Sequence, residues 1–365
     1  MNYTIAIIPG DGIGPEIMEE TIQLLQTVGN VFGHNFRCME VLAGTRALEG
    51  GKEPFPAEGL SLCREADSIL MGKLAVGRYP HLKFPQRPES VLAKLRAGLE
   101  LVSDVRPCFL WESLQDCCPL KKHIQSRGMD ILVVRDIAGG MFAAKGRSVQ
   151  MVDQRAAWDT ESYNEQQIQD SARLAFDLAR SRSRKVTSLD KAILLSSSAL
   201  WRQVVKEIHK EYLDVELNHM LVDHGAFQLI TQPDQFDVIL ASNVFGDIIS
   251  DEIAGLTGAG ELLPAGSLNR ERKGLYTPNQ LHQVMEQDVG TGRADPIGLI
   301  LAAGMMLEYS LNRKQEADAV KQAVMEVLDE GKATQDFWTE GKELLTTKQM
   351  GQAIREKIAS NHKDI

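Results

Sequence analysis

The sequence alternates short apolar runs, of a length suited to buried strands, with longer segments whose apolar residues recur at helical spacing. The first run is YTIAIIP, and the segment after it places Ile17, Leu24 and Val28 on one helical face. Strands separated by helices predict an α/β architecture. The expected strands are residues 3–9, 68–72, 130–136, 191–195 and 237–242, and the expected helices begin at Glu16, span 90–101 and 166–181, and recur from Asp295 onward.

Size and charge exclude several classes of protein. The chain has 365 residues, enough for two domains of roughly 150 residues each. Its formal net charge of −10 argues against nucleic-acid binding and against docking on an anionic membrane, since both need a basic surface. The five cysteines, an odd number without a C-x-x-C spacing, argue against a disulfide framework or a zinc site. No signal segment and no apolar run of roughly 18 residues is present, so we expect a cytoplasmic protein.

A glycine-rich turn, GDGIGP at residues 10–15, joins the first expected strand to the first expected helix. It contains G-x-G, but the complete G-x-G-x-x-G pattern with an acidic residue about 20 positions later is not met. Two interpretations follow. The turn binds a phosphate at the helix N-terminus, or it is a tight connection in which Pro15 suits the first helical position.

Three arginines in the first half of the chain could bind a di- or tricarboxylate. Arg96 falls in an expected helix, Arg106 precedes a proline, and Arg135 ends an expected strand. A guanidinium holds a carboxylate through two parallel hydrogen bonds. The alternative for each arginine is a local ion pair or a helix cap.

The segment SNVFGDIISDEIAG places Asp247 and Asp251 four positions apart in an expected helix. That spacing stacks both carboxylates on one face, where they repel each other. Together with Asp223 they could hold a hard cation such as Mg²⁺ or Mn²⁺, which prefers oxygen ligands. The alternatives are a solvated helix face for the pair and an N-cap role for Asp223.

Lys191 follows Asp190 at the start of an expected strand. A lysine desolvated beside an apolar strand can act as a general base. The alternative is an ordinary solvated strand end.

Several motifs, present in order over nearly the whole chain, resemble the β-decarboxylating dehydrogenases, which act on 3-isopropylmalate, isocitrate, homoisocitrate, tartrate or D-malate. The motifs are IIPGDGIGPE, RPESVLAKLR, DVRP, VVRDIAGG, the Asp190-Lys191 pair and SNVFGDIISDEIAGL. The resemblance implies an isocitrate/isopropylmalate dehydrogenase-like α/β fold of two domains with a central cleft, and not a standard Rossmann fold. It implies a cofactor-binding domain made of residues 1–102 and 258–365, and a substrate, metal and dimerisation domain made of residues 103–257.

The resemblance also implies roles for individual residues. Asp247 and Asp251 match metal-binding aspartates. Asp223 matches a third, and Lys191 a lysine that helps to deprotonate the substrate hydroxyl; in this family the partner subunit of a homodimer contributes both. The implied cofactors are Mg²⁺ or Mn²⁺ and NAD. The implied substrate contacts are Arg96, Arg106, Arg135, Glu89 and Leu92, and the implied cofactor contacts are Ile13, His282, Asp288, Gly290 and Asp295.

The chemistry that the resemblance implies is oxidative decarboxylation of a small dicarboxylate. The substrate hydroxyl loses its proton, a hydride passes to the nicotinamide, and the resulting β-keto acid loses carbon dioxide. Val91, Leu92 and Ala93 follow Glu89 and favour an alkyl group, so a 2-alkylmalate such as 3-isopropylmalate is the first expectation. Tartrate, D-malate or homoisocitrate is the alternative, and Glu89 could equally be an exposed acid at a helix start.

Three places depart from the family pattern. Phe142 stands where a catalytic tyrosine is expected, and the loss of a general acid typically costs roughly 10²–10⁴-fold in rate. Ile193 stands where an asparagine is expected. The adenosine-binding loop reads HQVMEQDVGTG at residues 282–292, and GKLAVGRYP at residues 72–80 is also altered. A second interpretation is therefore a catalytically weakened or silent subunit that binds substrate or metal in a regulatory role.

Overall fold

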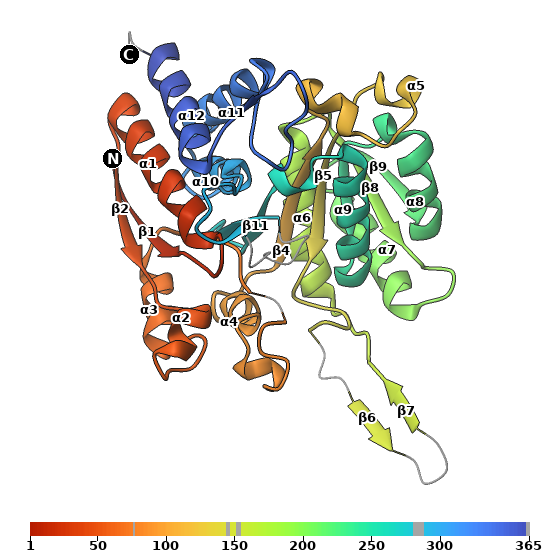
Figure 1. Ribbon diagram of the computed structural model, residues 1–365. Helices are drawn as coiled ribbons and strands as arrows, with labels where there is room; N and C mark the ends of the chain where they lie inside the picture. The colour runs from red at the N-terminus through yellow and green to blue at the C-terminus, as the bar shows by residue number, and fades with distance from the viewer. Residues whose placement is uncertain (76, 144–146, 151–154, 280–287, 363–365) are drawn as a thin grey trace. The chain divides into compact units, whose positions relative to one another are not determined.

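The computed structural model describes residues 1–75, 77–143, 147–150, 155–279 and 288–362. The chain divides into two compact units (Figure 1). The first consists of Met1–Glu100, Trp111–Asp116 and Ala259–Ile365, and the second of Leu101–Leu110 and Cys117–Gly258. The α/β class expected from the sequence is confirmed. Within the described ranges, no helix combines the length and the apolar character needed to cross a lipid bilayer.

The first unit contains five strands that are hydrogen-bonded side by side in the order β2-β1-β3-β12-β11. β1 runs parallel to β2 and β3, β12 runs parallel to β3, and β11 runs antiparallel to β12. β3 and β12 are buried along their whole length, as expected for central strands. The strands are β1 (Asn2–Ile8), β2 (Asn35–Glu40), β3 (Ser68–Met71), β11 (Pro264–Leu268) and β12 (Gly274–Pro278), with a short pair β13 (Lys332–Ala333) and β14 (Glu343–Leu344).

The apolar helix α10 is central to the helical layer of the first unit, where it contacts β11, β12, α1 and α11. α12 lies against α1 and α11 in the same layer (Figure 1). The helices are α1 (Gly14–Phe32), α2 (Gly44–Glu49), α3 (Ala57–Glu65), α4 (Ser90–Gly98), α10 (Ile297–Tyr309), α11 (Lys314–Asp329) and α12 (Thr347–Asn361), with short 3₁₀ turns η1 (Phe84–Gln86), η2 (Glu112–Cys117) and η4 (Gly260–Leu262).

The second unit contributes five strands in the order β4-β5-β10-β8-β9. β5, β10, β8 and β9 are parallel, and β4 is antiparallel to β5. The carboxyl ends of the parallel strands therefore meet at one edge of the sheet, where α/β proteins bind their ligands. The strands are β4 (Ser103–Phe109), β5 (Asp130–Asp136), β8 (Lys185–Asp190), β9 (Glu216–Leu221) and β10 (Val238–Ala241), with a separate antiparallel pair β6 (Arg147–Gln150) and β7 (Arg155–Trp158).

Two helix pairs cover this sheet. α6 packs on β5, β10 and α7, and α9 packs on β4, β5 and α8 (Figure 1). α6 starts with a capping box, in which the Asn164 side chain accepts the Gln167 backbone N–H and the Gln167 side chain returns the bond. The helices are α5 (Lys122–Gln125), α6 (Glu165–Arg180), α7 (Ser196–His209), α8 (Val222–Thr231) and α9 (Asn243–Thr257), with a 3₁₀ turn η3 (Pro233–Gln235).

One expected strand, residues 191–195, is wrong. The strand β8 ends at Asp190, and residues 191–195 form a turn before α7. The Asp190 carboxylate accepts the Ala192 N–H at 2.9 Å, which closes the turn. The apolar side chains Ile193 and Leu194 are 66% and 72% exposed, so the apolar run does not mark a buried strand.

Candidate active site

Two arginines and two aspartates form a cluster on β4, β5 and α9 of the second unit. Arg106 Nη1 donates to Asp251 Oδ1 at 2.9 Å, and Arg106 Nη2 lies 3.5 Å from Asp247 Oδ1. Arg135 Nη1 also donates to Asp247 Oδ1. The two guanidinium groups therefore offset the repulsion between the stacked carboxylates. Both carboxylates stay accessible, since the Asp247 and Asp251 side chains are 35% and 50% exposed.

The backbone of α9 approaches β5 closely enough to make this cluster. A Cβ at Gly246 would lie 2.7 Å from Arg135 Cβ, so only glycine fits there without displacement. Asn243 Oδ1 accepts Arg135 Nε at 3.1 Å and Nη2 at 2.8 Å. Asn243 Nδ2 donates to the Gly139 carbonyl at 2.9 Å. The arginine is thus oriented by the first turn of the helix that carries Asp247.

The electrostatics of the cluster suit anionic and cationic ligands together. Burial opposes the charge of Arg106, but Asp104, Asp247 and Asp251 outweigh it and raise the Arg106 pKa. Burial raises the pKa of Asp251, and Asp247 adds to the effect. Arg106 Nε is buried and has no hydrogen-bond partner among the described residues. Leaving a buried donor unsatisfied costs about 1–3 kcal/mol.

Lys191 and Asp223 meet at the carboxyl ends of β8 and β9, whose last residues Asp190 and Leu221 are paired. Lys191 Nζ donates to Asp223 Oδ1, and this bond lowers the Asp223 pKa. The helix cap of α8 is Leu221, so the N-cap alternative for Asp223 is wrong; the carboxylate lies in the first turn. In the described part of the chain, no three His, Cys, Asp or Glu side chains converge as a metal site, so a single protomer does not bring Asp223 together with Asp247 and Asp251.

The remaining expected substrate contacts lie on or beside α4 of the first unit. Arg96 Nε lies 3.4 Å from Ser267 Oγ. Glu89, at the N-cap position of α4, accepts the Gly77 backbone N–H at 2.7 Å, and its Oε2 is buried without a partner within the described ranges. Leu92 is half-buried. The Glu89 carboxylate therefore binds the backbone at Gly77 through one oxygen and has a second, buried oxygen without a partner among the described residues. It is not merely an exposed acid at a helix start.

The glycine-rich turn before α1 packs against its own unit. The amide of Asp11 donates to the Lys73 carbonyl at 2.7 Å, and the Asp11 carboxylate accepts the Thr45 N–H at 2.8 Å. Gly10 has a φ of 82°, and a Cβ there would collide with the Lys73 carbonyl oxygen. These contacts favour the tight-connection interpretation. Ile13 occupies the N-cap position of α1 without a side-chain cap.

The other expected cofactor contacts fall near residues 288–295. His282 lies outside the described residues. Gly290 has a φ of 70°, in a turn that follows Asp288. The Asp295 carboxylate accepts the Thr334 hydroxyl at 2.6 Å and a backbone N–H at the start of α10, and burial raises its pKa to about 6. The Asp295 carboxylate therefore fixes the N-terminus of α10 through a hydrogen bond.

Phe142 follows the Gly139-Gly140 turn at the end of β5. Its ring is 60% exposed, and its centroid lies 5.8 Å from Arg135 Cζ. The ring therefore stands beside the cluster, as the expected tyrosine would, but without a hydroxyl.

Sequence reasoning missed three residues of this site. Asn243 and Ser250 both lie inside the quoted SNVFGDIISDEIAGL motif, and Ser250 Oγ accepts Arg106 Nη1 at 2.8 Å. The Tyr163 hydroxyl accepts the Asn243 N–H at 2.8 Å. The same hydroxyl packs against Gly140, where an added Cβ would lie 2.6 Å from it. The motif could have identified the first two, whereas no local pattern identifies Tyr163.

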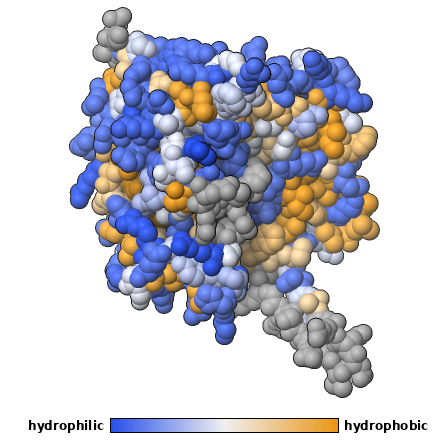
Figure 2. Space-filling model, viewed as in Figure 1, coloured by the Kyte–Doolittle hydropathy of each residue, from blue (hydrophilic) through white to orange (hydrophobic). Residues whose placement is uncertain are grey.

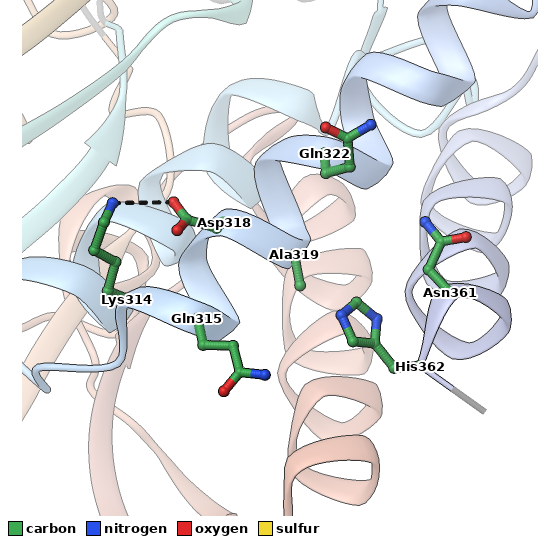
Figure 3. A pocket seen from close by; sticks show the side chains of 7 residues that line it. All are labelled: Lys314, Gln315, Asp318, Ala319, Gln322, Asn361 and His362. Atoms are coloured by element: carbon green, nitrogen blue, oxygen red, sulfur yellow. Dashed lines mark hydrogen bonds and ion pairs between the residues drawn. The ribbon is translucent and has the colours of Figure 1, made fainter. Parts of the chain in front are cut away.

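A surface cavity of about 620 Å³ lies elsewhere, against α11 and α12 (Figure 3). On its rim, Lys314 Nζ donates to Asp318 Oδ1 at 3.2 Å. Its lining residues are Lys314, Gln315, Asp318, Ala319, Gln322, Asn361 and His362. None of them is an expected site residue, so the candidate site is the cluster in the second unit.

The chain is similar to known proteins over almost its full length. The family model described as "Isocitrate/isopropylmalate dehydrogenase" matches residues 4–354. The 3-isopropylmalate dehydrogenase of Clostridium acetobutylicum is 42% identical over 96% of this chain and 98% of its own. That of Mannheimia succiniciproducens is 43% identical over 98% of this chain and 99% of its own. The solved isocitrate dehydrogenase of Methylococcus capsulatus is 29% identical, with a TM-score of 0.82 over 98% of this chain and 99% of that one.

Proposed function

Because this chain belongs to the isocitrate/isopropylmalate dehydrogenase family, we propose that it catalyses the oxidative decarboxylation of a 2-alkylmalate, with 3-isopropylmalate as the first candidate. One observation carries the proposal: Arg106 and Arg135 lie beside Asp247 and Asp251, and Arg106 keeps a buried unsatisfied donor. This arrangement offers cationic forks for a dianion and oxygen ligands for a cation at the same place.

The substrate carboxylates would be held by guanidinium groups. Arg106 is proposed to hold a carboxylate oxygen through its Nη atoms, which lie beside the partly exposed Asp247 and Asp251. Arg135 is held by Asn243 in a fixed orientation, which suits a geometrically defined contact. Arg96 is proposed as a third carboxylate contact, and Glu89 and Leu92 as the residues beside the alkyl group.

The donor set of α9 fits Mg²⁺ or Mn²⁺. These ions are commonly held by one or two carboxylates, with water and substrate oxygens completing the coordination. Asp247 and Asp251 present two partly exposed carboxylates on one helix face. When bound, the cation would supply positive charge that stabilises negative charge developing on the substrate. Asp223 is proposed as a further ligand, contributed by the partner subunit.

Proton transfer is assigned to Lys191 and to a group other than Phe142. Lys191 is proposed to relay the proton of the substrate hydroxyl: its ammonium group gives up a proton to solvent, and the neutral amine then takes the proton of the hydroxyl. Phe142 has no proton to give to the carbon that decarboxylation leaves behind, so water would supply it. We therefore expect a slower enzyme than a relative with a tyrosine at this position.

NAD would be the hydride acceptor. The proposed contacts are Ile13, His282, Asp288, Gly290 and Asp295. Burial raises the pKa of Asp336, Asp288 and Glu261 add to the shift, and Lys73, which pairs with Glu261, opposes it. A carboxylate suits the hydroxyls of a ribose and repels a ribose phosphate, so Asp288 as a ribose contact would favour NAD over NADP.

A homodimer with shared sites is the proposed active form. Apolar side chains gather over helices α8 and α9 (Figure 2). Phe227, Ile230 and Ile248 are 59%, 50% and 61% exposed there. An exposed apolar surface of this kind is typical of an interface between copies of one chain.

A second candidate function is a subunit that binds substrate and metal without turnover. Phe142 and the exposed Ile193 favour it, since both replace polar residues expected near the reacting atoms. It keeps the same ligands and differs only in the absence of catalysis.

A steady-state assay separates the two candidates. Purified protein receives Mg²⁺ or Mn²⁺, NAD or NADP, and 3-isopropylmalate, isocitrate, tartrate or D-malate, and reduced nicotinamide is followed by absorbance. We expect turnover with 3-isopropylmalate and NAD, which is abolished by a chelator and restored by Mn²⁺. Absence of turnover on every substrate, with Mn²⁺ and 3-isopropylmalate still binding by calorimetry, would establish the second candidate.

A further inference from the structure

The turn that carries Lys191 is held only weakly by its apolar side chains. Lys191 accepts the Leu194 and Leu195 N–H groups at 2.9 and 3.0 Å through its carbonyl, which gives the turn its shape. The side chains of Ile193 and Leu194 are more than half exposed, so little buried apolar area holds the turn against the sheet. Lys191 Nζ is bonded to Asp223, and a further contact fixes the backbone of the turn where the chain leaves β8.

Asp190 makes that contact. Its side chain is only 1% exposed, and Oδ1 accepts the Ala192 N–H inside the turn. On its other side it meets Arg202 of α7, with Arg202 Nε donating to Oδ2 at 2.8 Å and Nη2 to Oδ1 at 2.8 Å. Two parallel bonds between a guanidinium and a carboxylate fix geometry as well as charge. The carboxylate therefore ties the turn to a helix through a rigid fork.

The neighbouring His219 does not share this task. Its Nδ1 lies 3.9 Å from Asp190 Oδ2, outside hydrogen-bond distance, and neither ring nitrogen has a partner among the described residues. Burial and the charge of Arg202 lower the His219 pKa to about 4, so the ring is neutral at neutral pH. Arg202 is thus the cation that balances the buried Asp190 carboxylate.

We propose that Asp190 and Arg202 are positioning residues, which fix the 190–195 turn and so aim Lys191 Nζ at the substrate hydroxyl. The inference rests on the proposed function, because it assigns Lys191 to proton transfer. Neither residue touches the substrate: they act through the turn. A displaced base slows the chemical step and leaves the binding of carboxylates by Arg106 and Arg135 intact.

The test compares Arg202→Lys with Arg182→Lys. The first keeps the charge and loses the two parallel bonds. The second is a matched control in the same sheet: Arg182 Nε donates to the buried Asp237 at 2.7 Å and Nη2 to Asp130 at 2.9 Å, at the amino ends of β10 and β5. We expect Arg202→Lys to lower kcat by roughly 10- to 100-fold with KM changed less than about threefold, and Arg182→Lys to leave both near the wild-type values.

Amide hydrogen exchange of the peptide covering residues 190–195 is the second readout. We expect faster exchange in Arg202→Lys and unchanged exchange in Arg182→Lys. If Arg202→Lys does not fold, Arg202→Gln, which keeps side-chain donors of smaller size, takes its place. Wild-type kcat in the variant, or a lower kcat with unchanged exchange of the turn, overturns the positioning role.

Failure of this inference and failure of the proposed function can be told apart. If the wild-type protein turns over no malate derivative, the function fails, and the role of Asp190 and Arg202 in aiming Lys191 falls with it. If the wild-type protein is active and Arg202→Lys is as active as Arg182→Lys, only the positioning role fails.

Discussion

At the scale of single residues, Phe142 decides between a slow enzyme and a silent subunit. Its ring already lies beside Arg135, so Phe142→Tyr adds a hydroxyl next to the cluster without a large change in volume. We expect kcat to rise by roughly 10- to 1000-fold, since a positioned general acid contributes on the order of 10²–10⁴-fold. Initial rates with 3-isopropylmalate measure the effect. Phe84→Tyr, at another exposed phenylalanine, is the control, and an equal response of both variants would contradict the assignment.

A second residue, Asp136, makes stability depend on pH. Its carboxyl is fully buried, accepting the Gly139 N–H at 2.7 Å and the Ser171 hydroxyl at 2.9 Å, and burial raises its pKa to about 6. Because the folded state holds this proton more tightly than the unfolded state, Asp136 adds stability below pH 4 that is lost as pH rises through about 6.

Asp136→Asn should remove this dependence. The free energy of unfolding of the wild type, relative to the variant, should fall by up to about 3 kcal/mol between pH 4 and pH 7, since one pKa unit corresponds to about 1.4 kcal/mol. Urea titrations at several pH values measure it. Asp159→Asn, at an exposed aspartate, serves as the comparison, and parallel pH curves for wild type and Asp136→Asn would refute the expectation.

Residue types and spacing predicted part of the site. The Asp247 and Asp251 pair follows from helical periodicity, and a compensating charge was expected because stacked carboxylates repel. That Arg106 and Arg135 supply this compensation could not be predicted, because β4, β5 and α9 come together only through the sheet order. Tyr163 was missed for the same reason, since it contacts the Gly140 turn and Asn243 from a distant part of the chain.

At the scale of elements, the fit of α9 against β5 depends on Gly246. Gly246→Ala would bring a methyl group within 2.7 Å of Arg135 Cβ, so the helix must shift. We expect a loss of about 1–3 kcal/mol of stability and weaker Mn²⁺ binding, because Asp247 moves with the helix. Thermal unfolding and calorimetry measure the two effects.

The same helix offers the control. Gly255 is exposed, and a Cβ there would meet nothing within 4 Å. Gly255→Ala should raise stability by about 0.5–1 kcal/mol, because alanine loses less backbone freedom on folding. Equal destabilisation by both substitutions would show that helix propensity, and not the contact with Arg135, sets the effect at Gly246.

Of two apolar runs that were both expected as strands, one is a strand and the other is not. Residues 130–136 were expected as a strand, and β5 spans Asp130–Asp136. The run at residues 191–195 was equally apolar but forms an exposed turn. Apolar composition indicates that a segment avoids water. It does not indicate whether the segment becomes a buried strand or an exposed turn.

At the scale of the whole molecule, the proposed shared site predicts complementation between inactive variants. Lys191→Ala and Asp251→Asn should each be inactive alone. In a mixed dimer one site receives Asp251 from the first chain and Lys191 from the second, so roughly a quarter of wild-type activity should return after subunit exchange. Mixtures are assayed after dissociation and reassociation.

Lys191→Ala mixed with Asp223→Asn is the matched control. Both residues would be contributed by the partner subunit, so every site in a mixed dimer would carry one defect and no activity should return. No recovery in the first mixture despite mixed dimers would place the whole site in one chain. Recovery in the second mixture would show that Lys191 and Asp223 of one chain serve different sites of the dimer.

The course of the chain has a consequence for its synthesis. The polypeptide passes between the two units after Glu100, Leu110, Asp116 and Gly258, so the first unit needs both ends of the chain. Its apolar strand β3 pairs with β12, through Ile69 and Leu275, only when residues from 274 onward have left the ribosome. Until then β3, a strand that is fully buried in the folded protein, has an open edge, the kind of surface on which chaperones act and nascent chains aggregate. The second unit is nearly contiguous and can fold while the first still waits for its last strands.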